Sequence, residues 1–262
     1  MIKITKVKRQ AKKTRYNLYE KNEIFICAVA ETTLIKFNLF VGTELTSEKL
    51  AEIITSDTQV RAYQSALNYL SYAIKSEYEI KKKLLDLGFT TNITDSVINK
   101  LKDKNLLNDL VYAKEYVRTK TLMGTDGPIK LRNALMKKQI ATVDIEDALA
   151  KYPVAKQLDN GKALVEKLNY RYRKEAVLKK RQKIYQQLIM KGYPANIIDK
   201  LLVMIDQDES NAELNNLLTQ ANKLWTRNQK YADNERRLKT KLMLANRGFK
   251  FDMIEEVLDK LN

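Results

Sequence analysis

The 262-residue chain carries 48 Lys and Arg against 32 Asp and Glu, no His and a single Cys, so its formal net charge is +16. The lack of His removes the side chain that most often exchanges protons near neutral pH, and one Cys excludes an internal disulfide or a thiolate zinc cluster. No apolar run approaches the roughly 20 residues that span a bilayer, and the N-terminus lacks the apolar core of a secretory signal. We therefore expect a cytoplasmic protein.

Residues 1–55 are predicted to form a small β-rich or α/β cap. Alternating apolar and polar residues predict a strand over 2–7, and two more strands are predicted over 15–18 and 23–29. One or two helical turns over 30–37 and a short helix over 47–54 complete this segment. Cys27 lies in an apolar run, so we interpret it as a buried hydrophobe and not as a nucleophile.

From residue 60 onward only helices are predicted, and residues 76–101 give the pattern. Apolar residues at helical spacing indicate two short helices joined at Gly88. Ser76, with Glu79 three residues later, forms a capping box that starts the first helix. Gly88 can adopt the left-handed conformation that ends it. Later helix starts are predicted at Asn108 and at Thr142.

The same helix–turn–helix phrase occurs four times. Turns are predicted at Gly88, Gln139, Gly192 and Gly248, which are 51, 53 and 56 residues apart, and each has a Leu four residues before it. This indicates a mainly α fold in which tandem three-helix repeats form a curved array. Gln enters positive φ less easily than Gly, so we expect the turn at Gln139 to be built differently or to be strained.

The predicted domains are the cap over 1–55 and four helical repeats, over 56–107, 108–152, 153–207 and 208–262. Pro and Gly lie close together in residues 153–161, which we expect to be a linker where the array bends.

No motif of enzyme chemistry is present. The sequence contains no P-loop, no dinucleotide-binding glycine motif, no nucleophile elbow and no metal-ligand spacing. We therefore expect a protein that is not an enzyme and that uses neither cofactor nor metal.

Positive charge is concentrated in the last two repeats, where residues 171–183 hold seven basic residues and one acid and residues 221–250 hold nine and two. This charge predicts a polyanionic partner. Tyr170 and Tyr172 interleave with Arg171 and Arg173, which suits base stacking together with phosphate contact. The alternative is that the tyrosines belong to the core and the cations form an ordinary solvated face, and we interpret Trp225 as a core residue. The candidate filament- or DNA-binding residues are Arg171, Arg173, Lys174, Lys179, Lys180, Arg181, Lys183, Arg227, Arg236, Arg237, Lys239 and Lys241.

Three stretches, taken as a set, resemble the RecX family, and the N-terminal ITKV...RYNLYEKNEIF...ETTLIKFNLFVGTEL resembles the added segment of its long form. The stretch ALNYLSYAIKSEYEIKKKLLDLGF resembles the family's YLSYR helix followed by RS..EL...L...G, and LKDKNLLNDLVYAKEYV resembles YLDD..YA..YV. GPIKLRNALMKKQI resembles KGP..I..EL..KGI. Departures occur at Ala73, where the family has Arg, at Asn108 for Asp, at Ala134 for Glu and at Gln139 for Gly.

The resemblance implies a regulator of the RecA recombinase. Such a protein binds the groove of the RecA–single-stranded DNA filament, limits filament growth or speeds its disassembly, and lowers ATPase and strand exchange, which places it in DNA repair, homologous recombination and the SOS response. The expected partners are RecA and single-stranded DNA, bound directly or through the filament, by a monomer without membrane contact. The residues alone leave two alternatives, a sequence-nonspecific nucleic-acid-binding helical repeat and an adaptor for an acidic protein.

Overall fold

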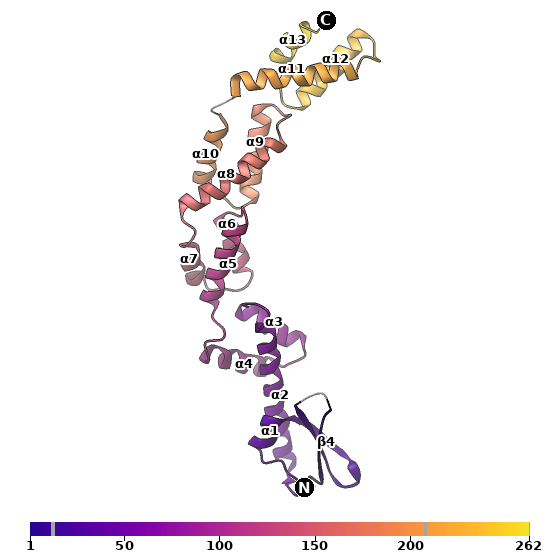
Figure 1. Ribbon diagram of the computed structural model, residues 1–262, viewed down its shortest axis with the longest axis vertical. Coiled ribbons are helices and arrows are strands. Elements are labelled where there is room, and N and C mark those ends of the chain that lie inside the picture. The colour runs from indigo at the N-terminus through magenta and orange to yellow at the C-terminus, as the bar shows by residue number, and fades with distance from the viewer. Residues whose placement is uncertain (12–13, 207–208, 262) are drawn as a thin grey trace. The chain divides into compact units, whose positions relative to one another are not determined.

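The structure, a computed structural model, describes residues 1–11, 14–206 and 209–261 and divides into two compact units. The first unit holds residues 1–112 and 138–140, and the second holds residues 113–137 and those from 141 onward. The described residues form thirteen α-helices and, near the N-terminus, five short strands (Figure 1). The predicted class, mainly helical with an N-terminal strand segment, is confirmed.

The N-terminal strands form two small sheets. β1 (Ile2–Lys3) pairs antiparallel with β5 (Glu44–Leu45), while β2 (Lys6–Arg9), β3 (Arg15–Tyr19) and β4 (Phe25–Ala30) form an antiparallel sheet in that order. The prediction of one strand over 2–7 is wrong because the chain changes sheets there: the Ile4 amide donates to Thr43 and the Thr5 amide to Tyr19. The other two strands are confirmed, although the 3₁₀ turn η1 (Lys21–Glu23) delays the start of β4.

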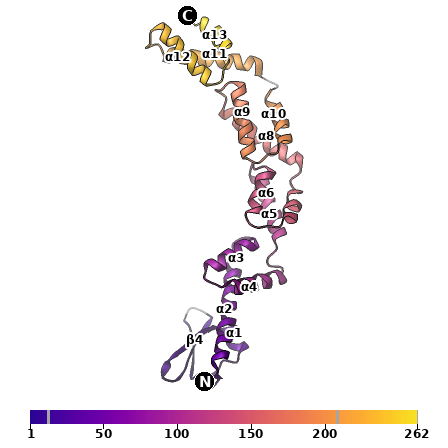
Figure 2. The same cartoon turned by 180° about the vertical axis from the view of Figure 1, so that it is seen from behind.

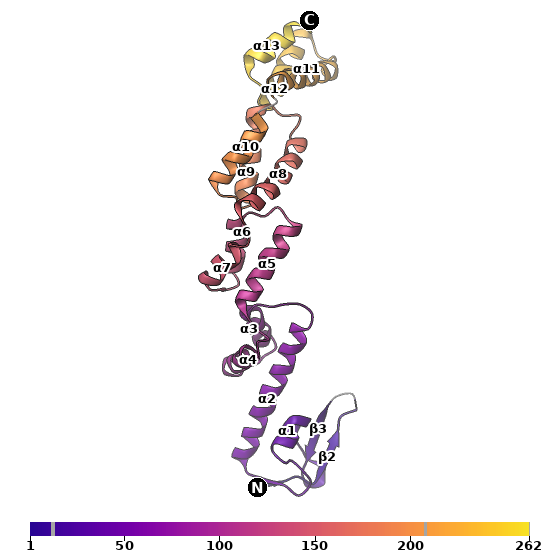
Figure 3. The same cartoon turned by 60° about the vertical axis from the view of Figure 1, so that its left-hand side comes forward.

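Two helices, α1 (Glu31–Lys36) and α2 (Ser47–Leu70), pack beside the three-stranded sheet (Figure 3). The prediction of a short helix over 47–54 is wrong because α2 continues for 24 residues. One end of this helix places Ile53 in the N-terminal core, and the other places Ala62 and Ala66 in the core of the first repeat. A single helix therefore serves two cores.

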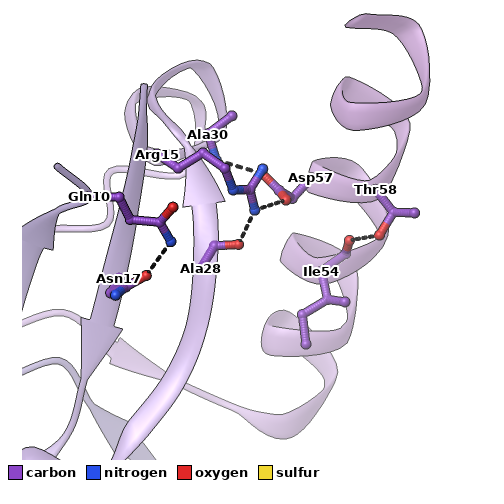
Figure 4. Close-up of polar contacts among 8 residues, drawn as sticks. All are labelled: Gln10, Arg15, Asn17, Ala28, Ala30, Ile54, Asp57 and Thr58. Carbon is purple, nitrogen blue, oxygen red and sulfur yellow. Dashed lines mark hydrogen bonds and ion pairs between the residues drawn. The ribbon is translucent and has the colours of Figure 1, made fainter. Parts of the chain in front are cut away.

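A buried ion pair joins the sheet to α2 (Figure 4). Asp57 is only 4% exposed; its Oδ2 accepts from Arg15 Nη2 at 2.7 Å and its Oδ1 accepts from the Ala30 amide at 2.6 Å. The same arginine nitrogen also donates to the Ala28 carbonyl. Because both carboxylate oxygens are bonded, the buried charge is compensated, and the outer edge of β4 is covered.

From α2 onward, the helices form repeats of three helices each. α2 is followed in the first repeat by α3 (Glu77–Asp86) and α4 (Thr91–Asp103), and the second repeat consists of α5 (Asp109–Met123), α6 (Pro128–Met136) and α7 (Thr142–Leu149). The third consists of α8 (Val154–Arg171), α9 (Val177–Met190) and α10 (Ala195–Asp206), which lie side by side (Figure 2). The fourth consists of α11 (Glu209–Arg227), α12 (Asp233–Asn246) and α13 (Phe251–Asp259). The predicted boundary at 207/208 lies outside the described residues.

Of the three predicted helix starts, two are confirmed and one is wrong. The capping box of Ser76 and Glu79 is confirmed, and the Asn108 side chain accepts from the Val111 amide at 3.1 Å, as expected of a cap. The cap predicted at Thr142 is wrong by one position because Ala141 occupies the N-cap.

The linker predicted over residues 153–161 is instead the beginning of α8, with Pro153 at its N-cap. Gly161 lies inside this helix for a packing reason. A Cβ at that position would lie 2.4 Å from Leu201 Cδ1 on α10, so a larger residue would force the buried Leu201 side chain to shift.

All four predicted turns have positive φ. The values are +85° at Gly88, +58° at Gln139, +81° at Gly192 and +90° at Gly248. Gln139 therefore has the same left-handed conformation as the three glycines, which costs an L-residue about 1 kcal/mol.

In the second unit, the turn of one repeat packs on the start of the second helix of the repeat before it, a contact that we call the repeat joint. At the start of α6, the Gly127 amide donates to the Lys191 carbonyl at 2.7 Å and the Ile129 amide to the Gly192 carbonyl at 3.0 Å. At the start of α9, the Ala176 amide donates to the Arg247 carbonyl at 3.0 Å. The first amides of a helix lack intrahelical partners, so turn carbonyls satisfy them.

The joint at α6 also contains a charge cluster. Asp126 Oδ1 accepts from Lys130 at 2.9 Å and from Lys191 at 3.0 Å. Burial by itself would raise the pKa of Asp126, but the hydrogen bonds from the two lysines outweigh it and leave the pKa below its ordinary value.

We predict that Gly192→Ala destabilises the protein far more than Gly88→Ala. Both residues have positive φ, which costs Ala about 1 kcal/mol. A Cβ at Gly192 would also lie 2.3 Å from the Lys130 amide nitrogen, whereas a Cβ at Gly88 meets nothing within 4 Å. This overlap adds roughly 1–3 kcal/mol. Urea unfolding of the full chain measures both losses, and equal losses would contradict the repeat joint.

We also predict a pH-dependent effect of Asp126→Asn. Because the folded-state pKa of Asp126 is lowered, the stability that it contributes is present above its unfolded pKa of about 3.9 and is lost as the pH falls through the folded pKa. The variant should be less stable than the wild type by about 1 kcal/mol at pH 7, and the difference should vanish in acid. Glu256→Gln, which breaks an exposed pair with Lys260, is the control and should show no measurable difference at either pH.

Candidate nucleic-acid interface

The connection between α8 and α9 presents cations and an aromatic ring to solvent. Tyr170 is 70% exposed, and the Arg173 guanidinium carbon lies 4.2 Å from its ring centroid while Nη1 donates to the Tyr170 carbonyl at 2.9 Å. Arg171 and Lys174 are exposed and form no ion pair within the part of the chain that the structure describes. Tyr172, by contrast, packs against the core of the third repeat. The interleaved pattern therefore contains one exposed ring and one core ring.

Of the predicted cations on α9, one contacts the fourth repeat and another pairs with a residue just before the start of α9. Lys179 donates to the Asn246 carbonyl, and a Cβ at Gly248 would lie 2.7 Å from Lys179 Cβ. Lys183 pairs with Glu175. Lys180 and Arg181 are partly buried on the same helix.

In the fourth repeat, Arg227 at the end of α11 is exposed and has no ion-pair partner among the described residues, whereas the cations of α12 are engaged. The Arg236 guanidinium carbon lies 4.1 Å from the ring centroid of Trp225, and its Nε donates to the Trp225 carbonyl at 3.0 Å. Trp225 packs against the core of this repeat, as predicted. Lys239 lies 3.6 Å from the ring centroid of Tyr231, and it lowers the pKa of that phenol by donating a hydrogen bond.

Two carboxylates of α13 hold the remaining cations of α12. Arg237 pairs with Glu255 and with Asp259 at 2.6 Å, and Lys241 also pairs with Glu255. The hydrogen bonds from Lys241 and Arg237 lower the pKa of Glu255. These pairs join α12 to α13, so both cations have a structural role.

The cation pattern of the third repeat recurs in the fourth. Within residues 171–183, five basic positions reappear after a shift of 56 residues, which is also the spacing of the turns Gly192 and Gly248: Arg171 and Arg227, Lys174 and Lys230, Lys180 and Arg236, Arg181 and Arg237, and Lys183 and Lys239. We call these ten residues the recurring cations.

A groove of about 730 Å³ adjoins the recurring cations. It lies between α9, α10 and the turn at Gly248, and it is lined by residues that include Leu178, Arg181 and Tyr185. Its lining combines apolar side chains with Lys179, Gln182 and Asp199, which suits an amphipathic surface.

Further cation–aromatic pairs lie in the first repeat, where sequence reasoning missed them. Lys100 lies 4.6 Å from the ring centroid of Tyr63, and Lys75 lies 4.7 Å from that of Tyr69. Helical spacing could not predict the contact between Tyr63 and Lys100 because the two residues lie on different helices, α2 and α4.

The described ranges contain neither a metal-binding cluster nor a helix suited to span a membrane. No group of three or more His, Cys, Asp or Glu is placed there to hold a metal ion, and no helix is both long and apolar enough to cross a bilayer. Cys27 is buried, and burial raises the pKa of its thiol to about 11.

Family models match almost the whole helical part of the chain. RecX, first three-helix domain, matches residues 62–101, and RecX, second three-helix domain, matches residues 108–149. RecX, third three-helix domain, matches twice, at residues 155–202 and 211–258. The proteins named Regulatory protein RecX from Limosilactobacillus reuteri and Leuconostoc mesenteroides are 35% and 34% identical to this chain over 99% and 100% of its length, and over 98% of their own. The chain belongs to the RecX family.

Solved RecX structures agree with this assignment. A crystal structure of regulatory protein RecX has a TM-score of 0.66 and 36% identity, and the match covers 77% of this chain and 98% of that one. A RecX structure from Lactobacillus salivarius has a TM-score of 0.54 and 38% identity, with 58% of this chain and 98% of that one covered. The two matches of the third RecX domain cover the two repeats in which the recurring cations lie.

Proposed function

We propose that this chain regulates the RecA recombinase by binding RecA–single-stranded DNA filaments and limiting filament extension, ATPase and strand exchange. Its membership of a family of regulatory proteins supports a regulatory role. On this proposal the chain acts as a monomer in the cytoplasm, without catalysis of its own.

The recurrence of basic residues in the third and fourth repeats is the observation that carries this proposal. A polyanion that runs past successive repeats meets cations at each repeat when they occur at corresponding positions. The five pairs of recurring cations meet this condition. A solvated face needs positive charge but does not need it at matched positions.

We assign the phosphate or carboxylate contacts first to Arg171, Lys174 and Arg227, which are exposed and have no ion-pair partner among the described residues. Arg173 and Tyr170 can contact a base or a side chain as a stacked pair. The other candidates also lie in the third and fourth repeats, and most of them hold helices together. They are Lys179, Lys180, Arg181, Lys183, Arg236, Arg237, Lys239 and Lys241.

The exposed cation–aromatic pairs favour one alternative, direct sequence-nonspecific binding of nucleic acid. A stacked ring beside a cation binds single strands without RecA. This alternative predicts tight binding to naked single strands, with affinity falling steeply as salt rises.

We predict that Arg171→Gln/Lys174→Gln/Arg227→Gln weakens inhibition of RecA's DNA-dependent ATPase. The wild type should inhibit at substoichiometric amounts. The variant should require about tenfold more protein, because each lost charge removes a contact with a polyanionic filament. The stability of the fold should not change, since these side chains hold no other residue of the described chain in an ion pair.

The matched control is Lys151→Gln/Lys162→Gln/Lys200→Gln, which removes the same charge from exposed positions outside the recurring cations. It should inhibit like the wild type. A wild-type chain that leaves the ATPase untouched in excess would refute the proposed function. Equal weakening in both variants would remove the recurring cations from it.

A further inference from the structure

The three-stranded sheet has one face in the core and another toward solvent. Leu18 pairs in register with Val7 and Cys27, and all three side chains pack in the N-terminal core. Successive residues of a strand point to opposite faces, so Asn17 and Tyr19 lie on the other face. The residues that we call the outer sheet face are Lys6, Lys8, Gln10, Asn17, Tyr19 and Phe25.

Aromatic and amide groups form an ordered row on the outer sheet face. Phe25 is 56% exposed, and its ring centroid lies 5.9 Å from that of Tyr19 at an interplanar angle of 71°. Asn17 Nδ2 donates to the Tyr19 hydroxyl at 3.1 Å, and Gln10 Nε2 donates to Asn17 Oδ1 at 2.6 Å. The Gln10–Asn17 bond is visible beside the Arg15–Asp57 pair (Figure 4). These bonds fix the tyrosine ring, and they leave the amides and the phenol able to bond a base edge.

Basic residues outnumber acids around this row, where Glu23 pairs with Lys6. The first 15 residues contain seven Lys and Arg and no acid. Lys8 lies opposite Asn17 and is exposed, with no ion-pair partner among the residues that the structure describes, and Lys6 lies opposite Tyr19 and pairs with Glu23. A ring that is available for stacking is thus flanked by ammonium groups.

We propose that the outer sheet face binds single-stranded nucleic acid, with bases on Phe25 and Tyr19 and phosphates on Lys6 and Lys8. A single strand fits better than a duplex because only unpaired, unstacked bases present a free face to an aromatic side chain. This site lies in the first unit, whereas the recurring cations lie in the second. It adds a contact to the proposed function, and its residues support it independently.

A cross-strand aromatic pair can also serve the sheet alone. That reading predicts that changes to the outer sheet face alter stability and leave nucleic-acid binding intact. The two readings therefore separate in a binding experiment on naked DNA, which needs no RecA.

The test is Phe25→Leu/Lys6→Gln/Lys8→Gln in the full chain, titrated against a fluorescently labelled thymidylate oligomer of about 20 nucleotides. Leu keeps an apolar side chain but removes the stacking face. Affinity should fall about tenfold. The plot of log affinity against log salt should become shallower by about 1.4, or roughly 0.7 for each lost phosphate contact.

The matched control is Phe40→Leu/Lys36→Gln/Lys49→Gln. It changes an aromatic residue of nearly equal exposure, 55%, and two lysines of the same N-terminal region, away from the outer sheet face. It should bind like the wild type. No loss in the first variant, or an equal loss in both, would overturn the proposal.

A second readout covers the case in which the triple variant fails to fold. Phe25→Trp places a second indole in the outer sheet face, in addition to the chain's single native Trp225 in the second unit. Addition of the thymidylate oligomer should quench emission beyond that seen with the wild type, because a stacked base quenches indole. Quenching no greater than in the wild type would also overturn the proposal. Neither measurement involves the ATPase, so this proposal and the proposed function can fail separately.

Discussion

The contact between a left-handed turn and the start of a neighbouring repeat's second helix is the constraint on which the second unit depends. The turn presents the carbonyls of Lys191 and Gly192 to the amides of Gly127 and Ile129, so one contact satisfies donors and acceptors that their own helices leave free. The bonds between the turn and the helix start are therefore formed by the backbone. The joint requires Gly at position 192, where a side chain would overlap the start of α6 in the preceding repeat. A Gly is not required at position 139, where an exposed Gln is accommodated.

The positive charge of the chain divides into two populations with different physical roles. Arg237 and Lys241 pair with carboxylates on α13, and Lys191 pairs with Asp126, so carboxylates of the same chain largely neutralise their charge. Arg171 and other cations at the helix connections remain exposed. Net charge alone therefore overstates the field that is available to a partner, and the exposed minority should dominate binding.

Sequence reasoning found what depends on local spacing. The four turns, the capping box at Ser76 and the repeat order follow from apolar periodicity and from residues that lie within a few positions of one another. It failed where tertiary packing decides. The unbroken α2 is stabilised by packing in two separate cores, which local spacing does not reveal. Gly161 was assigned to a linker because its close contact with Leu201 is a tertiary contact. The sequence shows the basic clusters but not their ion pairs. The carboxylates that pair with Arg237, for example, lie 18 and 22 residues away along the chain.

A joint bonded through main-chain atoms has an evolutionary consequence. The third repeat accepts the turn of the fourth at the start of α9 through the Ala176 amide and the Arg247 carbonyl, groups that every copy of the unit would carry. A duplicated gene segment can therefore dock on its parent at once, before any surface substitution has accumulated. The copies are then free to diverge outside the joint, as Tyr170 and its counterpart Thr226 have done. Lengthening by tandem duplication thus needs no new interface to be invented.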